Sequence, residues 1–557
     1  MADMQKNKKP RKDDFLVQGA ILAAAAVITK IIGVVYRIPL TNILGNEGNG
    51  FYGYAYEIYA MALMLSSFSL PIAVSKLVSA RMAQRQRRNA FRVFLCALAF
   101  AVIVGLFISL VIFFGADAIS THMMKSPLSA YALQVLAPGL FIVAILGVLR
   151  GYFQGLGTMV PTAISQILEQ IVHAVVSIAG ASILLKIGIQ AGKEKGNELL
   201  GPAYGAAGGT LGTITGALIA LLFLIFVFWL YRRIIRRQIH LDRSRRQESY
   251  GHILKILLIT IAPVIFSTAI YNINQILDLT VFNFIMDAQG YVEKEYMALQ
   301  GIYTGKYNTL INVPLAMANG LAASVIPSLT VALASRKKSL VHQKISQTMR
   351  FTMLIAIPCF VGFVVLASPL MVLLYNDSSK TPAILLASGA ITVILYSWST
   401  VSNSILQGLD KMSVPAKNAG ISLVIHIVAL LIMLVVCKMG IYALVGSNIV
   451  FGICMCLLNE RAIRKTCGYH QEIVFTFLKP LLAAVIMGAV TYAVHLCLDL
   501  IIGGRFIPTC ISIFIAVIVY AVAILKLGVL TAKEIAGFPQ GKKLLRLCRK
   551  FHLLAAE

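Results

Sequence analysis

Two basic residues, Lys30 and Arg37, lie inside an apolar stretch near the start of the chain. Charged side chains are costly within a membrane span and as a rule face a cavity, water or a charged partner. Arg37 follows Lys30 by about two helical turns and returns to nearly the same helix face. Lys and Arg bind phosphate groups through charge-assisted hydrogen bonds. Together with Lys306, beside Tyr307 at the start of a later apolar segment, they could form a cationic surface for an anionic headgroup.

The alternative for these cations is a position at the membrane interface. Long basic side chains near helix ends extend their charged groups into the headgroup region while their stems stay in the apolar phase. This alternative stays open for Arg37 and Lys306. Lys30 lies roughly 22 Å along a helix from Phe15, at about 1.5 Å per residue, and that depth favours a cavity.

Three acidic residues, Glu57, Glu169 and Asp278, also fall inside predicted spans. Carboxylates in this setting can pair with the cations, carry protons or bind a coupling ion. The alternative is a structural hydrogen bond between helices. For His173 and His426 we favour interhelical packing over metal binding or proton relay, because neither has another ligand type nearby in sequence.

The sequence lacks the motifs of common catalytic and nucleotide chemistry. It has no Walker A loop, no HExxH and no GxSxG. Its nine cysteines form no CxxC pair and no metal-ligand spacing. We therefore expect neither an enzyme nor a metal or other cofactor. Transport would depend on the membrane potential, on a monovalent cation gradient or on the substrate gradient. One charge that moves through 100 mV is worth about 2.3 kcal/mol.

The composition indicates that lipid is the main solvent of this chain. Of its 557 residues, 59% are hydrophobic and 13% are charged, whereas soluble domains have about 25% charged residues. A spanning helix needs about 20 mostly apolar residues, so the sequence predicts an all-α polytopic membrane protein with about fourteen transmembrane helices. The expected spans are 15–38, 51–74, 91–115, 127–149, 160–186, 204–230, 253–283, 305–333, 351–374, 382–406, 415–437, 441–458, 474–497 and 506–527.

Basic residues alternate with these spans. Most of the 49 Lys and Arg lie in the tails and in every second connection, including 76–92, 231–255 and 335–350. The positive-inside rule then places both termini in the cytoplasm. The net charge of +27 is explained by topology and by attraction to the inner leaflet. We therefore expect contacts with membrane lipids and none with nucleic acid.

Two blocks of the sequence recur after about 250 residues. Gln154-Gly155-Leu156 and His173 return as Gln407-Gly408-Leu409 and His426, all 253 positions later (407 − 154 = 426 − 173 = 253). Gly50, Tyr52 and Tyr56 return as Gly301, Tyr303 and Tyr307, each 251 positions later. Because each half holds an even number of spans, the halves are expected to be parallel repeats about an axis along the membrane normal, with the substrate between them.

This repeat sets the expected domain organisation. Gly155 and Gly408 each follow a span, and we expect them to adopt the positive φ of a tight reversal. The expected parts are a cytoplasmic N-terminal tail (1–14), a first six-helix lobe (15–230), a cytoplasmic linker (231–252), a second six-helix lobe (253–458), two further helices (474–527) and a cytoplasmic C-terminal tail (528–557).

Several of these segments, in this order, resemble the multidrug/oligosaccharidyl-lipid/polysaccharide (MOP) exporter superfamily, and more narrowly its SpoVB/YtgP branch, which is related to the MurJ lipid II flippases. The resemblance extends over nearly the whole chain. It is carried by the run from Ile28 to Leu40, Leu44-Gly45, Gly50-Phe51-Tyr52-Gly53, Arg150 to Gly155 with Pro161, Glu169-Gln170, and Asn274 to Asp278.

The resemblance implies a V-shaped pair of lobes with alternating access in a bacterial plasma membrane. It implies export of an undecaprenyl-pyrophosphate-linked sugar, above all lipid II, with the last two helices forming a groove for the lipid tail. Lys30 and Arg37 match cations on the first helix of MurJ-type proteins, with a spacing that differs by one, and Lys306 lies near a cation on the eighth. We expect a monomer. Another lipid-linked oligosaccharide flippase and a MATE-like drug/cation antiporter remain alternatives.

Overall fold

The computed structural model describes residues 12–66, 69–240, 242, 247–334, 337–502 and 506–529. Within these residues the regular structure is helical and no strand is formed. The predicted all-α architecture is therefore confirmed for the described part of the chain. The chain divides into two compact units, Met1–Gly305 and Lys306–Glu557.

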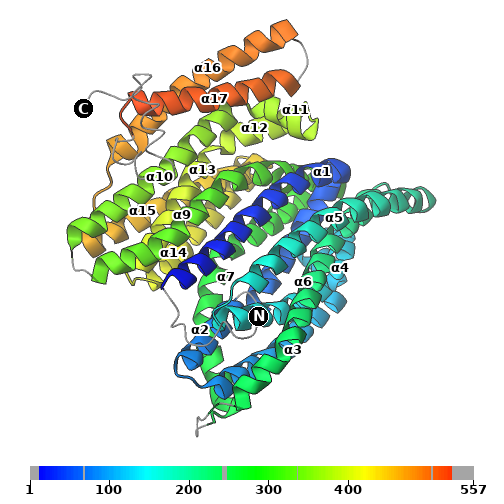
Figure 1. The fold of residues 1–557 in the computed structure, drawn as a ribbon. Coiled ribbons are helices and arrows are strands. Elements are labelled where there is room, and N and C mark those ends of the chain that lie inside the picture. Colours follow the sequence, from blue (N-terminus) through cyan, green and yellow to red (C-terminus); the bar gives the residue numbers. More distant parts are fainter. Residues whose placement is uncertain are drawn as a thin grey trace. The chain divides into compact units, whose positions relative to one another are not determined.

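Long helices form most of both units (Figure 1). In the first unit they are α1 (Lys12–Ser66), α2 (Leu70–Ala83), α3 (Arg87–Ala118), α4 (Ala130–Gly155), α5 (Val160–Lys195), α6 (Leu200–His240), α7 (Tyr250–Ala288) and α8 (Glu293–Gly301). In the second they are α9 (Asn308–Ala334), α10 (Lys338–Val365), α11 (Ala367–Tyr375), α12 (Lys380–Gly389), α13 (Ile391–Gly408), α14 (Ser413–Leu431), α15 (Tyr442–Cys467), α16 (Lys479–Ile502) and α17 (Phe506–Lys526). The π-helical turns η3 (Ile302–Tyr307) and η5 (Val474–Leu478) lead into α9 and α16.

Twelve helices in the described residues are long and apolar enough to cross a membrane. The predicted number of fourteen is not confirmed as such. One of the twelve, Ala24–Met64, contains parts of two predicted spans, 15–38 and 51–74. The predicted span 253–283 lies in α7, which is not among the twelve. The predicted end of the second span is wrong, since α1 ends at Ser66 and α2 begins at Leu70.

α1 consists of two helices joined at a sharp break. Gly45 has φ +67° and ψ −173°, a conformation open to glycine because it has no Cβ. The Asn49 side chain donates to the carbonyl oxygens of Thr41 (2.8 Å) and Gly45 (2.6 Å), which the break deprives of helical donors. The Arg37 guanidinium lies 4.3 Å from the ring centroid of Tyr52, although a straight helix would separate their backbones by about 22 Å. The second half of α1 therefore folds back along the first.

The second half of α1 crosses α8 with the two backbones in direct contact. A Cβ added to Gly50 would overlap the carbonyl oxygen of Met297, and one added to Gly301 would overlap that of Asn46. These two contacts are equivalent under the sequence repeat, since 297 − 46 = 301 − 50 = 251. Corresponding segments of the two predicted repeats therefore meet each other at this crossing, and glycine is required on both sides.

The repeated Gln-Gly-Leu blocks end α4 and α13. The prediction that Gly155 and Gly408 supply a positive φ is wrong, because both are the last residues of their helices. The positive φ occurs two residues later, +86° at Gly157 and +61° at Asp410, again 253 positions apart. Gly155 instead allows close packing on α2, since an added Cβ would lie 2.6 Å from Val78 Cβ. The two turns share their backbone geometry although the residue types differ.

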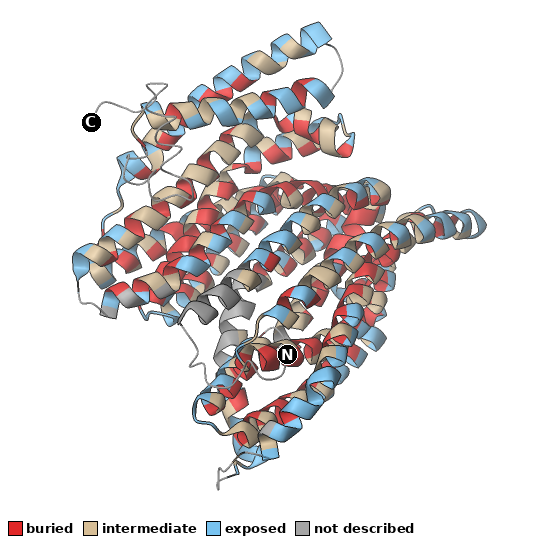
Figure 2. Cartoon of the chain, in the orientation of Figure 1, coloured by how far each residue is buried: buried red, intermediate tan, exposed pale blue. Residues whose placement is uncertain are grey.

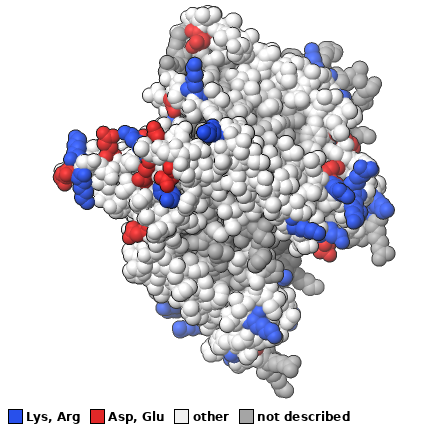
Figure 3. Space-filling model, turned by 180° about the vertical axis from the view of Figure 1, so that it is seen from behind, with Lys and Arg blue, Asp and Glu red and all other residues white. Residues whose placement is uncertain are grey.

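Apolar side chains divide between buried cores and exposed helix faces. In the first unit a core joins α2, α3, α4 and α6, and in the second unit cores join α9 with α10 and α13, and α10 with α16. Outward faces of α16 and α17 are largely exposed (Figure 2), as at Leu500 and Phe514. On the face drawn in Figure 3, wide areas carry none of the described charged residues. These surfaces are those of a multi-pass membrane protein.

The segment predicted as the linker between lobes is fastened to the first unit. Glu248 forms an ion pair with Arg81 at the end of α2. The Asp242 carboxylate accepts a hydrogen bond of 2.6 Å from the backbone N–H of Arg88. α7 and α8 also pack against α1, so the division into compact units falls at residue 305 and not at 231–252. The lobe boundaries, which follow the repeat rather than compactness, stay a prediction.

Replacing Gly301 by Val should destabilise the protein. The added side chain would overlap the Asn46 backbone, and such overpacking costs about 1–3 kcal/mol. Thermal unfolding of the detergent-purified protein should show a midpoint lower by several degrees. The matched control is Gly362→Val in α10, where an added Cβ would have no neighbour within 4 Å. Equal losses in the two variants would contradict the role given to the crossing.

Candidate functional site

The two halves of α1 bring a cation and aromatic rings together. The Arg37 guanidinium lies over the Tyr52 ring at 4.3 Å, a favourable cation–π geometry. Tyr52 stacks on Tyr56 with ring centroids 6.0 Å apart, and Glu57 is half-buried at the next position. No carboxylate in the described residues forms an ion pair with Arg37. Its guanidinium therefore keeps N–H donors for an anionic ligand.

His173 holds the residue beside Arg37 in place. Its Nε2 lies 3.2 Å from the Tyr36 hydroxyl and 3.4 Å from the Thr213 hydroxyl, so that α1, α5 and α6 meet at one ring. The repeated His426 has Nδ1 2.8 Å from the Ser447 carbonyl oxygen and links α14 to α15. Each histidine makes an interhelical contact, which fits the packing role that we favoured for both.

Lys30 lies in the first half of α1, and its side chain is exposed. It forms no ion pair with a carboxylate of the described residues. Arg37 shares this property and lies nearly two turns further along the same half of α1. The structure thus places two predicted cations on one helix, each without a carboxylate at ion-pair distance among the residues it describes.

Glu169 is held in an interhelical ion pair. Its Oε2 lies 2.6 Å from Nη2 of Arg150, which also donates through Nε to the Ser165 hydroxyl at 3.0 Å. This contact joins α4 to α5, as the structural alternative for Glu169 expects. Arg150 was missing from the predicted site residues. A signal was present, because Arg150 directly follows one predicted span and Glu169 is an acidic residue inside the next, so the two opposite charges lie on neighbouring helices.

Asp278 is buried in α7, with 1% of its surface exposed. Two residues later in α7, the Thr280 hydroxyl forms a hydrogen bond with the Tyr54 hydroxyl of α1. α7 therefore makes polar as well as apolar contact with α1. For Asp278 and for Glu57, a part in coupling stays a prediction.

Lys306 is a buried cation whose charge is already matched. It lies in η3 with 6% of its surface exposed, and its Nζ forms an ion pair with Asp377, which follows α11. Burial of Asp377 opposes ionisation. Hydrogen bonds from Lys306 and Ser379 and the Lys306 charge outweigh it and hold the Asp377 pKa below its usual range. A substrate that binds Lys306 would have to displace a carboxylate. The sequence did not single out Asp377, because their 71-residue separation carries no local signal.

These arrangements are suited to binding an anionic group. The described residues contain no group of three or more His, Cys, Asp or Glu that could hold a metal ion. The groups on α1 instead offer a positive charge, an aromatic platform and one carboxyl group. Such a set recognises an anionic group by charge and hydrogen bonding.

Removing one partner of the Lys306–Asp377 pair should be costly. Lys306→Met leaves the Asp377 carboxylate uncompensated at 15% side-chain exposure, which should lower the free energy of unfolding by about 3 kcal/mol. The double variant with Asp377→Leu should recover most of this loss in thermal unfolding. Lys294→Met is the matched control, because the Lys294–Glu198 pair is exposed and an exposed ion pair contributes little to stability. Equal effects at both pairs would contradict a buried, structural pair.

The contribution of Asp377 should also depend on pH. Since its folded pKa is lowered, the stability it adds is present above its unfolded pKa of about 3.9 and is lost as the pH falls through the folded pKa. The difference in thermal midpoint between the unmodified protein and Asp377→Asn should therefore be full at pH 7 and shrink below about pH 4. A difference that is constant over this range would argue against the ion pair as its source.

Comparison with known proteins identifies the family. The family described as "Polysaccharide biosynthesis protein" matches residues 16–333, more than half of the chain. Three proteins of Bacillus subtilis (strain 168) are similar in sequence. Lipid II flippase MurJ is 24% identical over 430 residues (74% of this chain, 75% of its own). Stage V sporulation protein B is 26% identical over 410 residues (73% and 75%). Uncharacterized membrane protein YabM is 25% identical over 546 residues (97% and 98%).

Solved structures share the fold. A lipid II flippase MurJ in an inward closed conformation gives a TM-score of 0.64 at 14% identity and covers 90% of this chain and 98% of its own. An inward-facing multidrug resistance MATE family transporter gives 0.62 at 17% identity and covers 81% and 99%. The predicted MATE/MurJ-like architecture is thereby confirmed. The chain belongs to the polysaccharide biosynthesis protein family, and its similarity to MurJ and to stage V sporulation protein B agrees with the resemblance to the SpoVB/MurJ-like branch of the MOP superfamily.

Proposed function

We propose that this protein is a flippase for lipid II, the lipid-linked peptidoglycan precursor. In this proposal it moves the undecaprenyl-pyrophosphate-linked sugar from the inner to the outer leaflet of a bacterial plasma membrane by alternating access. Support comes from the family match, from the sequence similarity to lipid II flippase MurJ and from the fold shared with a MurJ structure. The relatives named as a flippase or a transporter move substrates and are not enzymes.

The observation that carries the proposal is that the cations on α1 lack ion-pair partners. Arg150 and Lys306 are neutralised by Glu169 and Asp377, whereas Lys30 and Arg37 have no ion-pair partner among the described residues. A cation in an apolar span that lacks a carboxylate calls for another anionic partner. A pyrophosphate group, with several acceptor oxygens, would satisfy both.

Tyr52 and Tyr36 would hold Arg37 in a fixed orientation for this ligand. Tyr52 lies under the guanidinium, and Tyr36 is tied to His173 by a 3.2 Å contact. A cation held in this way loses less side-chain entropy when it binds an anion. Lys306 would contribute only by exchanging Asp377 for the substrate. Glu57 and Asp278 would serve in coupling, to the membrane potential or a monovalent cation, and Glu169 would stay structural.

A flippase for another lipid-linked oligosaccharide uses the same pyrophosphate contacts, so the cations alone do not distinguish it from a lipid II flippase. A drug/cation antiporter of the MATE type is favoured by the shared fold and by the carboxyl group of Glu57. The basic character of α1 favours an anionic substrate. We further propose a monomer with both termini in the cytoplasm, as the positive-inside rule indicates.

Removal of either α1 cation should abolish most of the transport. Lys30→Ala and Arg37→Ala each delete charge-assisted hydrogen bonds worth about 1.5–3 kcal/mol, which corresponds to a loss of roughly 10- to 100-fold in affinity for the headgroup. Transfer of lipid II to the outer leaflet, assayed in cells that depend on this protein, should fall accordingly at normal membrane abundance. The control is Lys186→Ala, an exposed lysine of α5, which should leave transport unchanged.

Two results would count against the proposal. Normal transport by both α1 variants would exclude the cations as the headgroup site. Lipid II that still reaches the outer leaflet after depletion of this protein, in a host without a redundant flippase, would exclude lipid II as the substrate. Accumulation of another lipid-linked sugar in the same depletion would point to the related flippase activity.

A further inference from the structure

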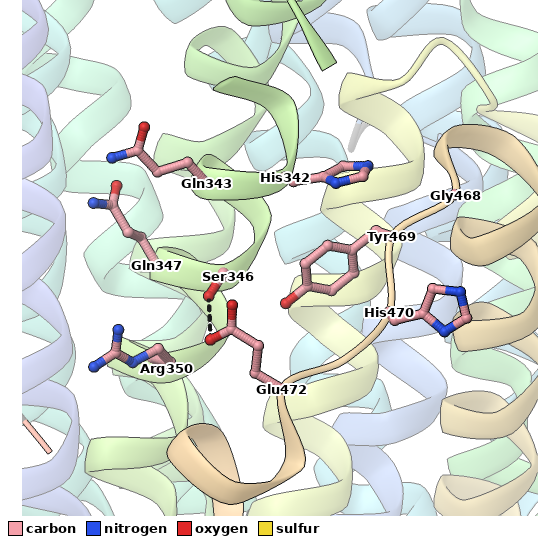
Figure 4. Close-up of a pocket in the computed structure, with 9 residues that line it drawn as sticks. All are labelled: His342, Gln343, Ser346, Gln347, Arg350, Gly468, Tyr469, His470 and Glu472. Carbon is pink, nitrogen blue, oxygen red and sulfur yellow. Dashed lines mark hydrogen bonds between the residues drawn. The ribbon is translucent and has the colours of Figure 1, made fainter. Parts of the chain in front are cut away.

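The second unit contains a polar cavity that the transport proposal does not use. It has a volume of about 540 Å³ and lies between the first turns of α10 and the segment that connects α15 to η5 (Figure 4). This volume is in the range of small-molecule sites. The lining residues are His342, Gln343, Ser346, Gln347, Arg350, Gly468, Tyr469, His470 and Glu472.

The sequence accounts for both walls of the cavity. The α10 residues at 342, 343, 346, 347 and 350 recur at helical spacing and form one polar stripe. The opposite wall begins at Gly468, whose φ of +72° ends α15 and turns the chain across the stripe. Tyr469 is buried in this segment with 4% exposure, and its hydroxyl points toward Ser346 and Glu472 (Figure 4). Burial raises the Tyr469 pKa to about 12, so this hydroxyl is protonated at neutral pH.

The cavity lies at the polar end of two candidate membrane spans. One span is Lys338–Val365, whose first turns are polar up to Arg350 and which continues as an apolar run. The other is Val474–Ile502, which begins two residues after Glu472. At the start of the second span the chain exposes apolar side chains, with 67% of Ile473 and 42% of Phe475 exposed. A polar cavity bordered by exposed apolar residues at the ends of two spans is at the depth of lipid headgroups.

Two opposite charges line this cavity, the half-buried Arg350 and the exposed Glu472. The Arg350 guanidinium donates to the Val529 carbonyl oxygen at 2.6 Å and lies 5.7 Å from the Phe475 ring. The Glu472 carboxylate accepts from the Ser346 hydroxyl at 3.0 Å, one helical turn from Arg350 (Figure 4). Besides its histidines, the lining carries one cationic residue, Arg350, and one carboxylate, Glu472. The cavity thus offers one anion-binding and one cation-binding group, each already held in place.

We propose that this cavity binds the headgroup of a zwitterionic phospholipid with a primary ammonium group, of the phosphatidylethanolamine type. The phosphate would lie on Arg350, with N–H donors from Gln343 and Gln347 nearby, and the ammonium would donate to Glu472. The acyl chains would run along the exposed apolar residues Ile473 and Phe475. This site is independent of the substrate that the protein transports.

Other ligand classes fit the same residues less well. Glu472 in the lining repels a headgroup that has a net negative charge. A trimethylated ammonium has no N–H group to donate to Glu472, and it finds no aromatic cage in the lining, where Tyr469 is the one aromatic ring apart from the histidines. A metal ion is not indicated, because the described residues contain no group of three or more suitable ligands.

The test is lipid binding to the full chain, purified in detergent and measured by native mass spectrometry. The probes are phosphatidylethanolamine, phosphatidylglycerol and phosphatidylcholine with identical palmitoyl and oleoyl chains. We expect phosphatidylethanolamine to bind about tenfold more tightly than the other two, as for one charge-assisted hydrogen bond. Glu472→Gln should remove this preference, and Arg350→Gln should weaken all three lipids. Glu194→Gln, at an exposed glutamate of α5, should leave both unchanged.

Several outcomes would overturn the proposal. Equal or tighter binding of phosphatidylglycerol would show a site for anionic lipid, and equal binding of phosphatidylcholine would remove the role of the ammonium N–H. An unchanged preference in Glu472→Gln would place the site elsewhere. If soluble phosphoethanolamine binds as tightly as the lipid, the acyl chains contribute nothing, and the ligand is not a membrane lipid. Thermal unfolding without added lipid identifies variants that misfold. If Glu472→Gln misfolds, Glu472→Asp replaces it, and the proposal then requires that variant to retain the preference.

Discussion

Direct backbone contact between α1 and α8 is the constraint on which the first unit depends. Glycine at 50 and 301 leaves no side chain between the helices, and in a membrane such close approach supplies dispersion contacts that replace the hydrophobic effect between helices. A Cβ on Gly53 would meet Thr304, its own counterpart in the repeat (304 − 53 = 251). The same crossing therefore brings residues that correspond in the sequence repeat into contact.

Charge is the second constraint, because lipid does not solvate it. The structure divides the intramembrane cations into two groups. Arg150 and Lys306 have carboxylates at ion-pair distance. Their charges are therefore explained by a structural role in the folded chain. Arg37, with an aromatic ring beneath it and no carboxylate at ion-pair distance among the described residues, keeps N–H donors for a ligand or for water. This distinction, rather than the mere presence of a charge, is what points to function.

The two proposed sites differ in charge balance, and this predicts different ligands. On α1, two cations without ion-pair partners favour a group with several negative charges, such as a pyrophosphate. In the cavity on α10, Arg350 and Glu472 balance each other, which favours a zwitterion. The difference between the two sites also depends on the path of the chain. At Gly468 the chain turns, so that the segment with Glu472 crosses the polar stripe of α10.

The sequence by itself determined the all-α membrane class, because long apolar runs in lipid can satisfy their backbone polar groups only as helices. It also determined the family, the duplication and the candidate charges, because these are recognised from residue types and their spacing. It did not determine which charges pair. Asp377 reaches Lys306 across 71 positions, and no periodicity records such a distance. The break at Gly45 falls in the predicted connection between the spans 15–38 and 51–74, but the sequence did not assign it to that residue. Only the tertiary structure decided that Arg37 would meet Tyr52 and that Lys306 would be buried against a carboxylate, because side-chain pairing depends on how helices fold back and cross.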